Sequence, residues 1–256
     1  MNKLLLLLSF LLIAKTLLGQ TNSEEFRKRI LTDEYIVKTD IKNEFTKYDI
    51  SSLLTQTKNS GVFGFIGDDY QRIRIKFISI IKNKENAGQY FVYGKSMVKD
   101  NICEFQGTIT ISSVFNFKNP DSPGIKQGKI VGDYLFYENP LQKHVGQFKG
   151  VFTSNWYLDK EGNLKYDDLS DVADDFANNE FVGTWTSYSG TVIKTCNWGD
   201  SRIPMSGDLD DGTGEFHPTH KYQTNGWLTY DQAYSGGISK DKEEEARKVE
   251  QKEWWK

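Results

Sequence analysis

A two-residue alternation of apolar and polar side chains fills most of the chain and constrains its fold more than any other feature. In "QRIRIKFISII", apolar residues at positions 73, 75 and 77 alternate with Arg72, Arg74 and Lys76. Successive side chains of a strand point to opposite faces, so this pattern indicates a strand with one buried face. About eight or nine such segments follow one another between Gly61 and Tyr230, separated by turn-forming residues. The chain is therefore predicted to be all-β.

Glycine recurs two positions before an aromatic residue inside these segments. In a strand the two positions share a face, where glycine lets the sheet bend and lets a neighbouring ring cover the backbone. We therefore predict a curved antiparallel sheet closed as a β-barrel, with a β-sandwich as the alternative. The four occurrences are Gly132-Asp133-Tyr134, Gly146-Gln147-Phe148, Gly150-Val151-Phe152 and Gly183-Thr184-Trp185.

Two segments depart from the alternation and have helical patterns. In "YDDLSDVADDFANN", residues 166–179, the apolar residues fall on one side and an aspartate is available to cap the start. The tail "SKDKEEEARKVEQKEWWK" predicts a charged, exposed helix that ends in Trp254-Trp255. We expect four parts: a signal peptide (1–19), a polar N-terminal segment (20–60), the β-barrel domain (61–235) and a charged helical tail (236–256).

The first residues have the three parts of a secretory signal peptide. Met1-Asn2-Lys3 is a short basic start, an apolar run covers residues 4–14, and the small residue Gly19 precedes the expected mature start at Gln20. A membrane helix needs about twenty apolar residues, so the run favours cleavage over its alternative, an uncleaved anchor. We expect an exported, soluble protein with no membrane span after cleavage.

The charge of the chain argues against a nucleic-acid partner. The formal net charge is −3, and it becomes −5 when Lys3 and Lys15 leave with the signal peptide (−3 minus 2). A nucleic-acid-binding domain normally carries a basic patch instead.

Cys103 and Cys196 are the only cysteines. Cys103 shares the apolar face of its alternating segment and is expected to be buried. Export would place both thiols in an oxidising compartment, where a pair can bridge. We predict a Cys103–Cys196 disulfide, with two buried free thiols as the alternative.

The stripe of Arg72, Arg74 and Lys76 is the candidate ligand-binding surface. Three cations on one strand face point either at water or into a polar cavity. In an open barrel they would bind a carboxylate or phosphate of a small ligand. Tyr93 would add hydrogen bonding or stacking, and Trp185 would stand at the lip of the pocket.

Motifs for hydrolysis, nucleotide binding and metal binding are missing from the sequence. It contains no Gly-x-Ser-x-Gly, His-Glu-x-x-His or Gly-x-x-x-x-Gly-Lys-Ser/Thr motif. The pair His217 and His220 has no nearby Cys or His to complete a zinc set. The acids around Asp208 lack the glutamate that an EF-hand needs at its twelfth position. We expect neither a metal nor a cofactor. A Ser-His-Asp set or a pair of carboxylates assembled in space stays open, because geometry defines both.

The motif Gly183-x-Trp185 resembles the Gly-x-Trp of lipocalins and related calycin barrels, where it closes one barrel end. In those barrels the motif lies near the first strand, whereas here it follows most of the strands. The whole chain also resembles the exported β-rich proteins that are common in Bacteroidota. That resemblance implies a periplasmic or cell-surface location in a Gram-negative bacterium.

These observations favour a non-enzymatic, exported β-barrel. We expect it to bind a small or lipidic ligand or to serve as an envelope scaffold with a protein partner. The alternative is a carbohydrate-acting hydrolase with paired carboxylates.

Overall fold

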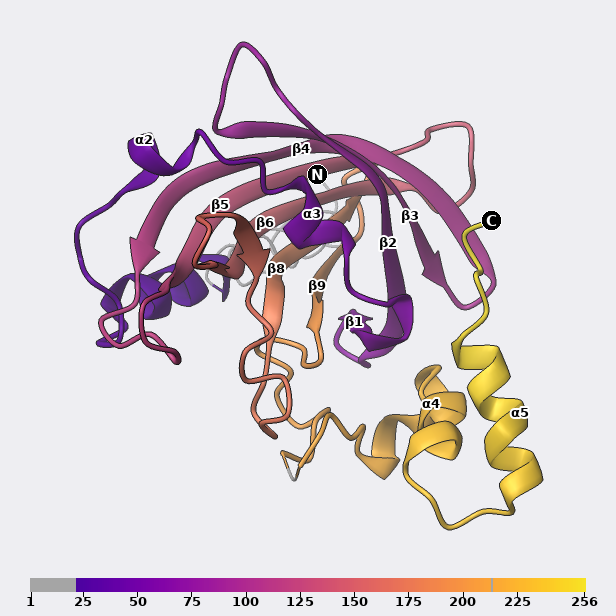
Figure 1. Ribbon diagram of the computed structural model, residues 1–256. Helices are drawn as coiled ribbons and strands as arrows, with labels where there is room; N and C mark the ends of the chain where they lie inside the picture. Colours follow the sequence, from indigo (N-terminus) through magenta and orange to yellow (C-terminus); the bar gives the residue numbers. More distant parts are fainter. Residues whose placement is uncertain (1–21, 213) are drawn as a thin grey trace.

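The alternating segments form a closed antiparallel β-barrel in the computed structural model, which describes residues 22–212 and 214–256 (Figure 1). Eight strands close the barrel in the order β1-β2-β3-β4-β5-β6-β8-β9, with β9 paired to β1, and β7 adds to the edge of β6. The closed sheet confirms the predicted fold and is compatible with a calycin-like barrel. The strands are β1 (Val62–Ile66), β2 (Gln71–Lys82), β3 (Gln89–Val98), β4 (Asn101–Asn116), β5 (Lys126–Glu138), β6 (Gly146–Leu158), β7 (Leu164–Tyr166), β8 (Asn178–Ser187) and β9 (Ile193–Asp200).

Aromatic side chains fill the middle of the barrel. Phe181 stacks on Trp198 with ring centroids 4.7 Å apart, and Tyr134 meets both rings edge-on. Glycine makes room for these rings, as predicted. A Cβ on Gly132 would lie 2.3 Å from Phe152, and one on Gly183 would lie 2.4 Å from the Tyr134 hydroxyl. The Gly-x-aromatic pattern therefore reports close packing of rings against the barrel wall.

Short helices close one end of the barrel. The chain before β1 forms α2 (Lys42–Phe45), α3 (Ser51–Thr55) and the 3-10 turn η1 (Asn59–Gly61). Phe45, Ile50, Leu53 and Leu54 are buried from this segment and join the aromatic core. Hairpin turns form the opposite end, because strands β1–β2, β3–β4, β5–β6 and β8–β9 all turn there.

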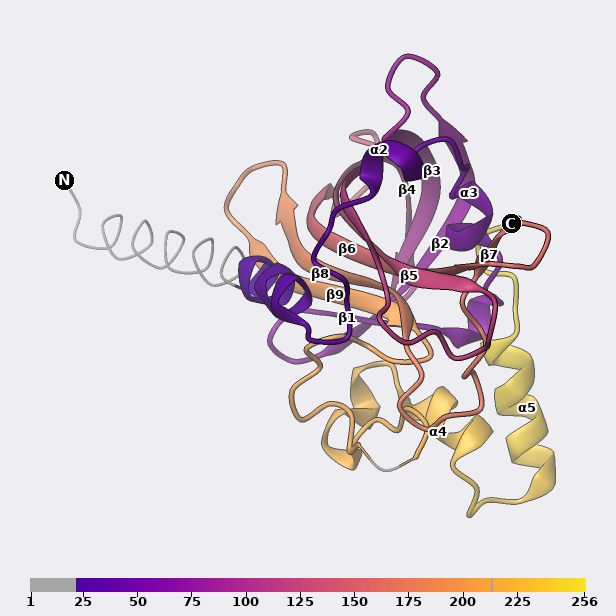
Figure 2. The ribbon, with the colours of Figure 1, turned by 60° about the vertical axis from the view of Figure 1, so that its left-hand side comes forward.

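Two helical segments pack on the outside of the wall (Figure 2). Residues 22–32 are helical and bury Phe26 and Ile30 against valines of β5, β6 and β8. The chain after β9 forms η2 (His220–Asn225), α4 (Leu228–Tyr234) and α5 (Lys240–Glu250), which we call the C-terminal layer. Trp227 and Tyr230 of this layer are buried with Phe63 and Phe65 of β1. None of the helices in the described part of the chain is long and apolar enough to cross a membrane.

The helix predicted for residues 166–179 is wrong. The first residue of this segment ends β7, its last two residues belong to β8, and the residues between them form turns and irregular loop. Asp167 shows the cause, because its carboxylate accepts hydrogen bonds from Gln127 and from the Leu169 amide. Aspartate side chains that bond locally compete with helix formation. The predicted tail helix is confirmed by α5, although its Ala246 and Glu250 are buried rather than exposed.

Candidate functional site

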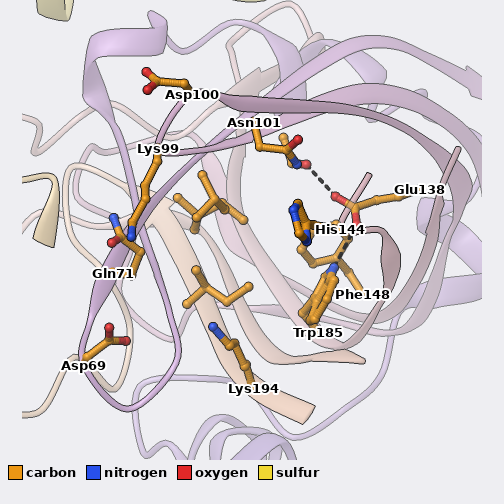
Figure 3. Close-up of a pocket in the computed structure, with 14 residues that line it drawn as sticks. Asp69, Gln71, Lys99, Asp100, Asn101, Glu138, His144, Phe148, Trp185 and Lys194 are labelled. Carbon is orange, nitrogen blue, oxygen red and sulfur yellow. Dashed lines mark hydrogen bonds between the residues drawn. The ribbon is translucent and has the colours of Figure 1, made fainter. Parts of the chain in front are cut away.

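The hairpin end of the barrel contains a cup of about 470 Å³, a size typical of small-molecule sites. Its wall is mainly apolar, with Ile66, Ile73, Val98 and Phe148 among the residues that line it. All of them occupy inward positions of the alternation on β1, β2, β3 and β6. Figure 3 shows the polar groups that line the cup.

A single buried carboxyl group lines the wall of the cup next to the β5–β6 turn. Glu138 is the last residue of β5 and is 4% exposed. One of its oxygens accepts a hydrogen bond from Ser96 Oγ at 2.6 Å. The other accepts from the Gly146 amide at 2.9 Å and from Trp185 Nε1 at 2.8 Å. No cation pairs with Glu138 in the described residues, and burial raises the pKa of its carboxyl, while these three hydrogen bonds oppose the rise.

The Gly-x-Trp motif supplies part of this site. Trp185 of β8 lines the cup, and its indole N–H points at the Glu138 carboxylate (Figure 3). Gly183, two residues earlier, lies under the Tyr134 hydroxyl. The structure therefore places Trp185 in the wall of the cup. It also gives the indole a role in orienting a buried acid.

The rim of the cup carries side chains of both charge signs, and strained residues stand on two of its hairpin turns. Lys99 and His144 have positive φ angles of 54° and 56°, a conformation that non-glycine residues seldom adopt. Lys194, Asp69 and Asp100 complete the charged rim. Backbone strain of this kind concentrates at binding sites, where the surrounding structure holds it in place.

Arg72 and Arg74 do not line the cup, and this corrects the expected ligand-binding stripe. Both side chains point outward from β2 and bind Glu250 of α5. Arg72 makes two hydrogen bonds to the carboxylate, at 2.9 and 2.7 Å, and Arg74 makes one at 3.0 Å. The sequence analysis considered water and a cavity as the surroundings of these cations. It did not consider a third partner, a helical layer that packs on the barrel.

Lys76 and Tyr93 also lie outside the cup. Lys76 Nζ is 5.0 Å from the centre of the Trp255 ring, so it too meets the C-terminal segment. Tyr93 is 37% exposed on the outer wall and donates its hydroxyl to Glu104 at 3.1 Å. Of the five predicted ligand-binding residues, the structure brings only Trp185 into the cup.

The predicted disulfide is not formed. Cys103 and Cys196 are both buried and free. They lie on β4 and β9, which are separated by three strands in either direction around the barrel. A disulfide needs Cα atoms about 4.4–6.8 Å apart, too short a span for opposite walls. Burial raises the pKa of both thiols, to about 11 for Cys103.

Sequence reasoning missed Glu138 and Ser96, although the pattern contained a signal for each. Glu138 continues the inward series of Tyr134 and Phe136 on β5, and Ser96 lies on the inward face of β3. A polar residue at an inward position of a strand is the feature that would have identified both.

A second buried acid lies at the opposite, helix-covered end of the barrel. Asp200 Oδ2 accepts hydrogen bonds from Thr57 at 2.6 Å, Asn179 at 2.7 Å and Tyr166 at 3.0 Å. Burial raises its pKa to about 6, and the same three bonds oppose that rise. Asp200 joins the end of β9 to β7, β8 and the segment before β1, so its role is structural.

The described residues contain no cluster of three or more His, Cys, Asp or Glu side chains placed to hold a metal ion. Comparison with protein-family models, with curated proteins and with solved structures finds no match to this chain. The proposals below therefore rest on the site itself.

Proposed function

We propose that the protein binds a small molecule with a mainly apolar body in the cup, and that a donor group of this molecule meets Glu138. The observation that carries the proposal is a buried carboxyl group in the wall of a mainly apolar cup, with no cation paired to it among the described residues. Pockets that combine apolar walls with a few convergent polar groups are the usual form of ligand sites.

The hydrogen bonds of Glu138 define the chemistry of the ligand. A carboxylate has about four acceptor positions, two on each oxygen. Among the described residues, one oxygen accepts from two donors, Gly146 and Trp185, and the other accepts from Ser96 alone. The remaining position suits a hydroxyl or amine hydrogen. The Trp185 ring and the aliphatic wall suit a body of one or two rings.

Substitution of Glu138 by glutamine gives a sharp test. The oxygen of the new side-chain amide would keep the bonds from Gly146 and Trp185, and its NH₂ group would donate to Ser96 and toward the ligand. The change therefore turns a ligand-facing acceptor into a donor with little change of shape. Glu104→Gln is the matched control, because Glu104 lies on the outer wall.

We expect one- and two-ring alcohols and amines to stabilise the wild type in thermal-shift and calorimetric titrations. Methyl ethers of the same skeleton should bind about tenfold or more weakly, because a buried acceptor would lose its donor. Glu138→Gln should remove or reverse this preference, and Glu104→Gln should keep it. Equal binding of alcohols and ethers by the wild type, or no binding of either, would refute the proposal.

Export and envelope location belong to the same proposal. They rest on residues 1–19, which lie outside the described residues. The hydrolase alternative has one supporting feature, the buried acid Glu138. The other acids that line the cup, Asp69 and Asp100, are exposed on rim turns, so the cup favours binding over paired-carboxylate chemistry.

A further inference from the structure

The C-terminal layer assembles a serine, a histidine and an aspartate, none of which lines the cup. Ser235 Oγ is 3.0 Å from His217 Nδ1. The other ring nitrogen, Nε2, is 3.7 Å from Asp231 Oδ1. Ser235 and Asp231 are four residues apart at the end of α4, so they project from the same side of the helix. The imidazole lies between them.

Local structure holds each member of this set in place. His217 lies next to an isolated β-bridge between Asp210 and Pro218, and its amide donates to Asp210. The second oxygen of Asp231 accepts a hydrogen bond from Gln223 at 2.9 Å. The aspartate is thus oriented from one side and faces the imidazole from the other.

The backbone after Ser235 forms a site for a negatively charged oxygen. Ser235 has right-handed φ and ψ angles of −85° and −9°, whereas Gly236 and Gly237 have φ angles of 73° and 81°. A right-handed residue followed by a left-handed one points successive N–H groups into one concavity that binds anions. No hydrogen bond from the amide of Gly236 or Gly237 is found within the described ranges.

A separate groove of about 400 Å³ is lined by sequence neighbours of this set, whereas Ser235, His217 and Asp231 are not among its lining residues. It is lined by Tyr234, the neighbour of Ser235, and by Glu215, two residues before His217. Phe63 and Tyr230 form an apolar part of its wall. An aryl or short acyl group fits these surroundings.

We propose that Ser235, His217 and Asp231 form a catalytic site for the hydrolysis of small carboxylic esters. Ser235 Oγ bonds to the ester carbonyl carbon while its proton passes to His217 Nδ1. The Gly236 and Gly237 amides hold the resulting oxyanion, and Asp231 faces the protonated imidazole. The C–O bond to the leaving group then breaks, and Nδ1 returns the proton to the departing alcohol. Water then bonds to the acyl carbon while its proton passes to His217 Nδ1, the bond from that carbon to Ser235 Oγ breaks, and Nδ1 returns the proton to Oγ, so that the acid leaves and Ser235 is restored.

The test uses the full-length protein and an alkyl fluorophosphonate, which bonds covalently to activated serines. We expect one adduct, located on Ser235 by peptide mass spectrometry. His217→Gln should slow its formation about 100-fold, as expected for loss of a general base. Asp231→Asn should slow it less, by about tenfold, because the 3.7 Å contact is longer than a hydrogen bond.

Two variants serve as matched controls. His220→Gln removes an exposed histidine three residues away, and Ser239→Ala removes an exposed serine four residues away. Both should label at the wild-type rate, and thermal unfolding of every variant checks that the fold is kept. With p-nitrophenyl acetate, the wild type should release a burst of one equivalent of nitrophenol that Ser235→Ala abolishes. Absence of a Ser235 adduct, or labelling of His217→Gln at the rate of His220→Gln, would overturn the proposal.

Discussion

Among residues of the C-terminal layer, Glu250 is the one whose substitution is expected to destabilise the protein most. It is 1% exposed and binds Arg72, Arg74 and Thr229, which donates its hydroxyl at 2.6 Å. Arg72 also lies 5.0 Å from the Trp227 ring centre and 5.6 Å from that of Tyr230. One carboxylate shared by two guanidinium groups is therefore a main link between the layer and β2, beside the hydrogen bond from Gln71 to the Asn225 carbonyl.

Glu250→Gln keeps the shape of the side chain and leaves the buried Arg72 and the partly buried Arg74 without this counter-charge. Removing one partner of a buried ion pair costs about 3–5 kcal/mol. A loss of about 3 kcal/mol lowers the Tm of a chain of this size by about 6–12 °C. Burial raises the pKa of Glu250, but the hydrogen bonds and charges of the two arginines outweigh this, and the net pKa is lowered. The stabilisation is therefore present above the ordinary pKa of a glutamate and is lost as pH falls through the lowered value.

Urea unfolding followed by tryptophan fluorescence measures this difference at pH 7 and at pH 3. We expect the difference in the free energy of unfolding between wild type and Glu250→Gln to be smaller at pH 3 than at pH 7. Glu244→Gln is the control, because Glu244 and its partner Lys248 are 71% and 70% exposed and should change stability by less than about 0.5 kcal/mol. The double variant Arg72→Met/Glu250→Met should recover at least half of the loss, since an apolar pair can replace a buried ion pair. If Glu250→Gln unfolds at the same urea concentration as Glu244→Gln, the argument is refuted.

Three further predictions follow from the barrel itself. Asp200→Asn should remove a change of about 3 kcal/mol in the free energy of unfolding between low and neutral pH. The raised pKa of about 6 makes the contribution of Asp200 to stability favourable below pH 4, and this contribution is lost as pH rises through 6. Equal pH profiles of variant and wild type in urea unfolding would contradict this. Gly183→Ala should destabilise by about 1–3 kcal/mol, because its Cβ would lie 2.2 Å from the Lys149 carbonyl oxygen; an unchanged melting temperature would argue against the packing. Cys103 and Cys196 should resist iodoacetamide at pH 8 in the native state, and both should react in denaturant without reductant. If no free thiol were found in denaturant, the disulfide would be supported instead.

Alternation and glycine placement predicted the barrel because both depend on local geometry. The period of two assigned Ile73, Ile75 and Phe77 to the interior, and each of them is buried there. The same pattern gave the outward direction of Arg72 and Arg74 but not their environment. That environment depends on Glu250, 178 and 176 residues away along the chain, and on how the last helices fold back.

The candidate site was predicted only in part for a similar reason. Trp185 belongs to a short motif and was identified by it. Glu138 became recognisable once the strand register placed it beside Ser96 and opposite the Trp185 indole. The helix predicted at 166–179 failed because local hydrogen bonds of Asp167 outweighed a weak apolar pattern.

A structure of the protein with its tightest-binding aryl alcohol tests the central claim most directly. We expect the ligand inside the cup, with its hydroxyl oxygen about 2.7 Å from the Glu138 oxygen that accepts from Ser96. Its ring should lie against Trp185. A ligand bound only on the outer wall, or in the cup with no contact to Glu138, would contradict the claim.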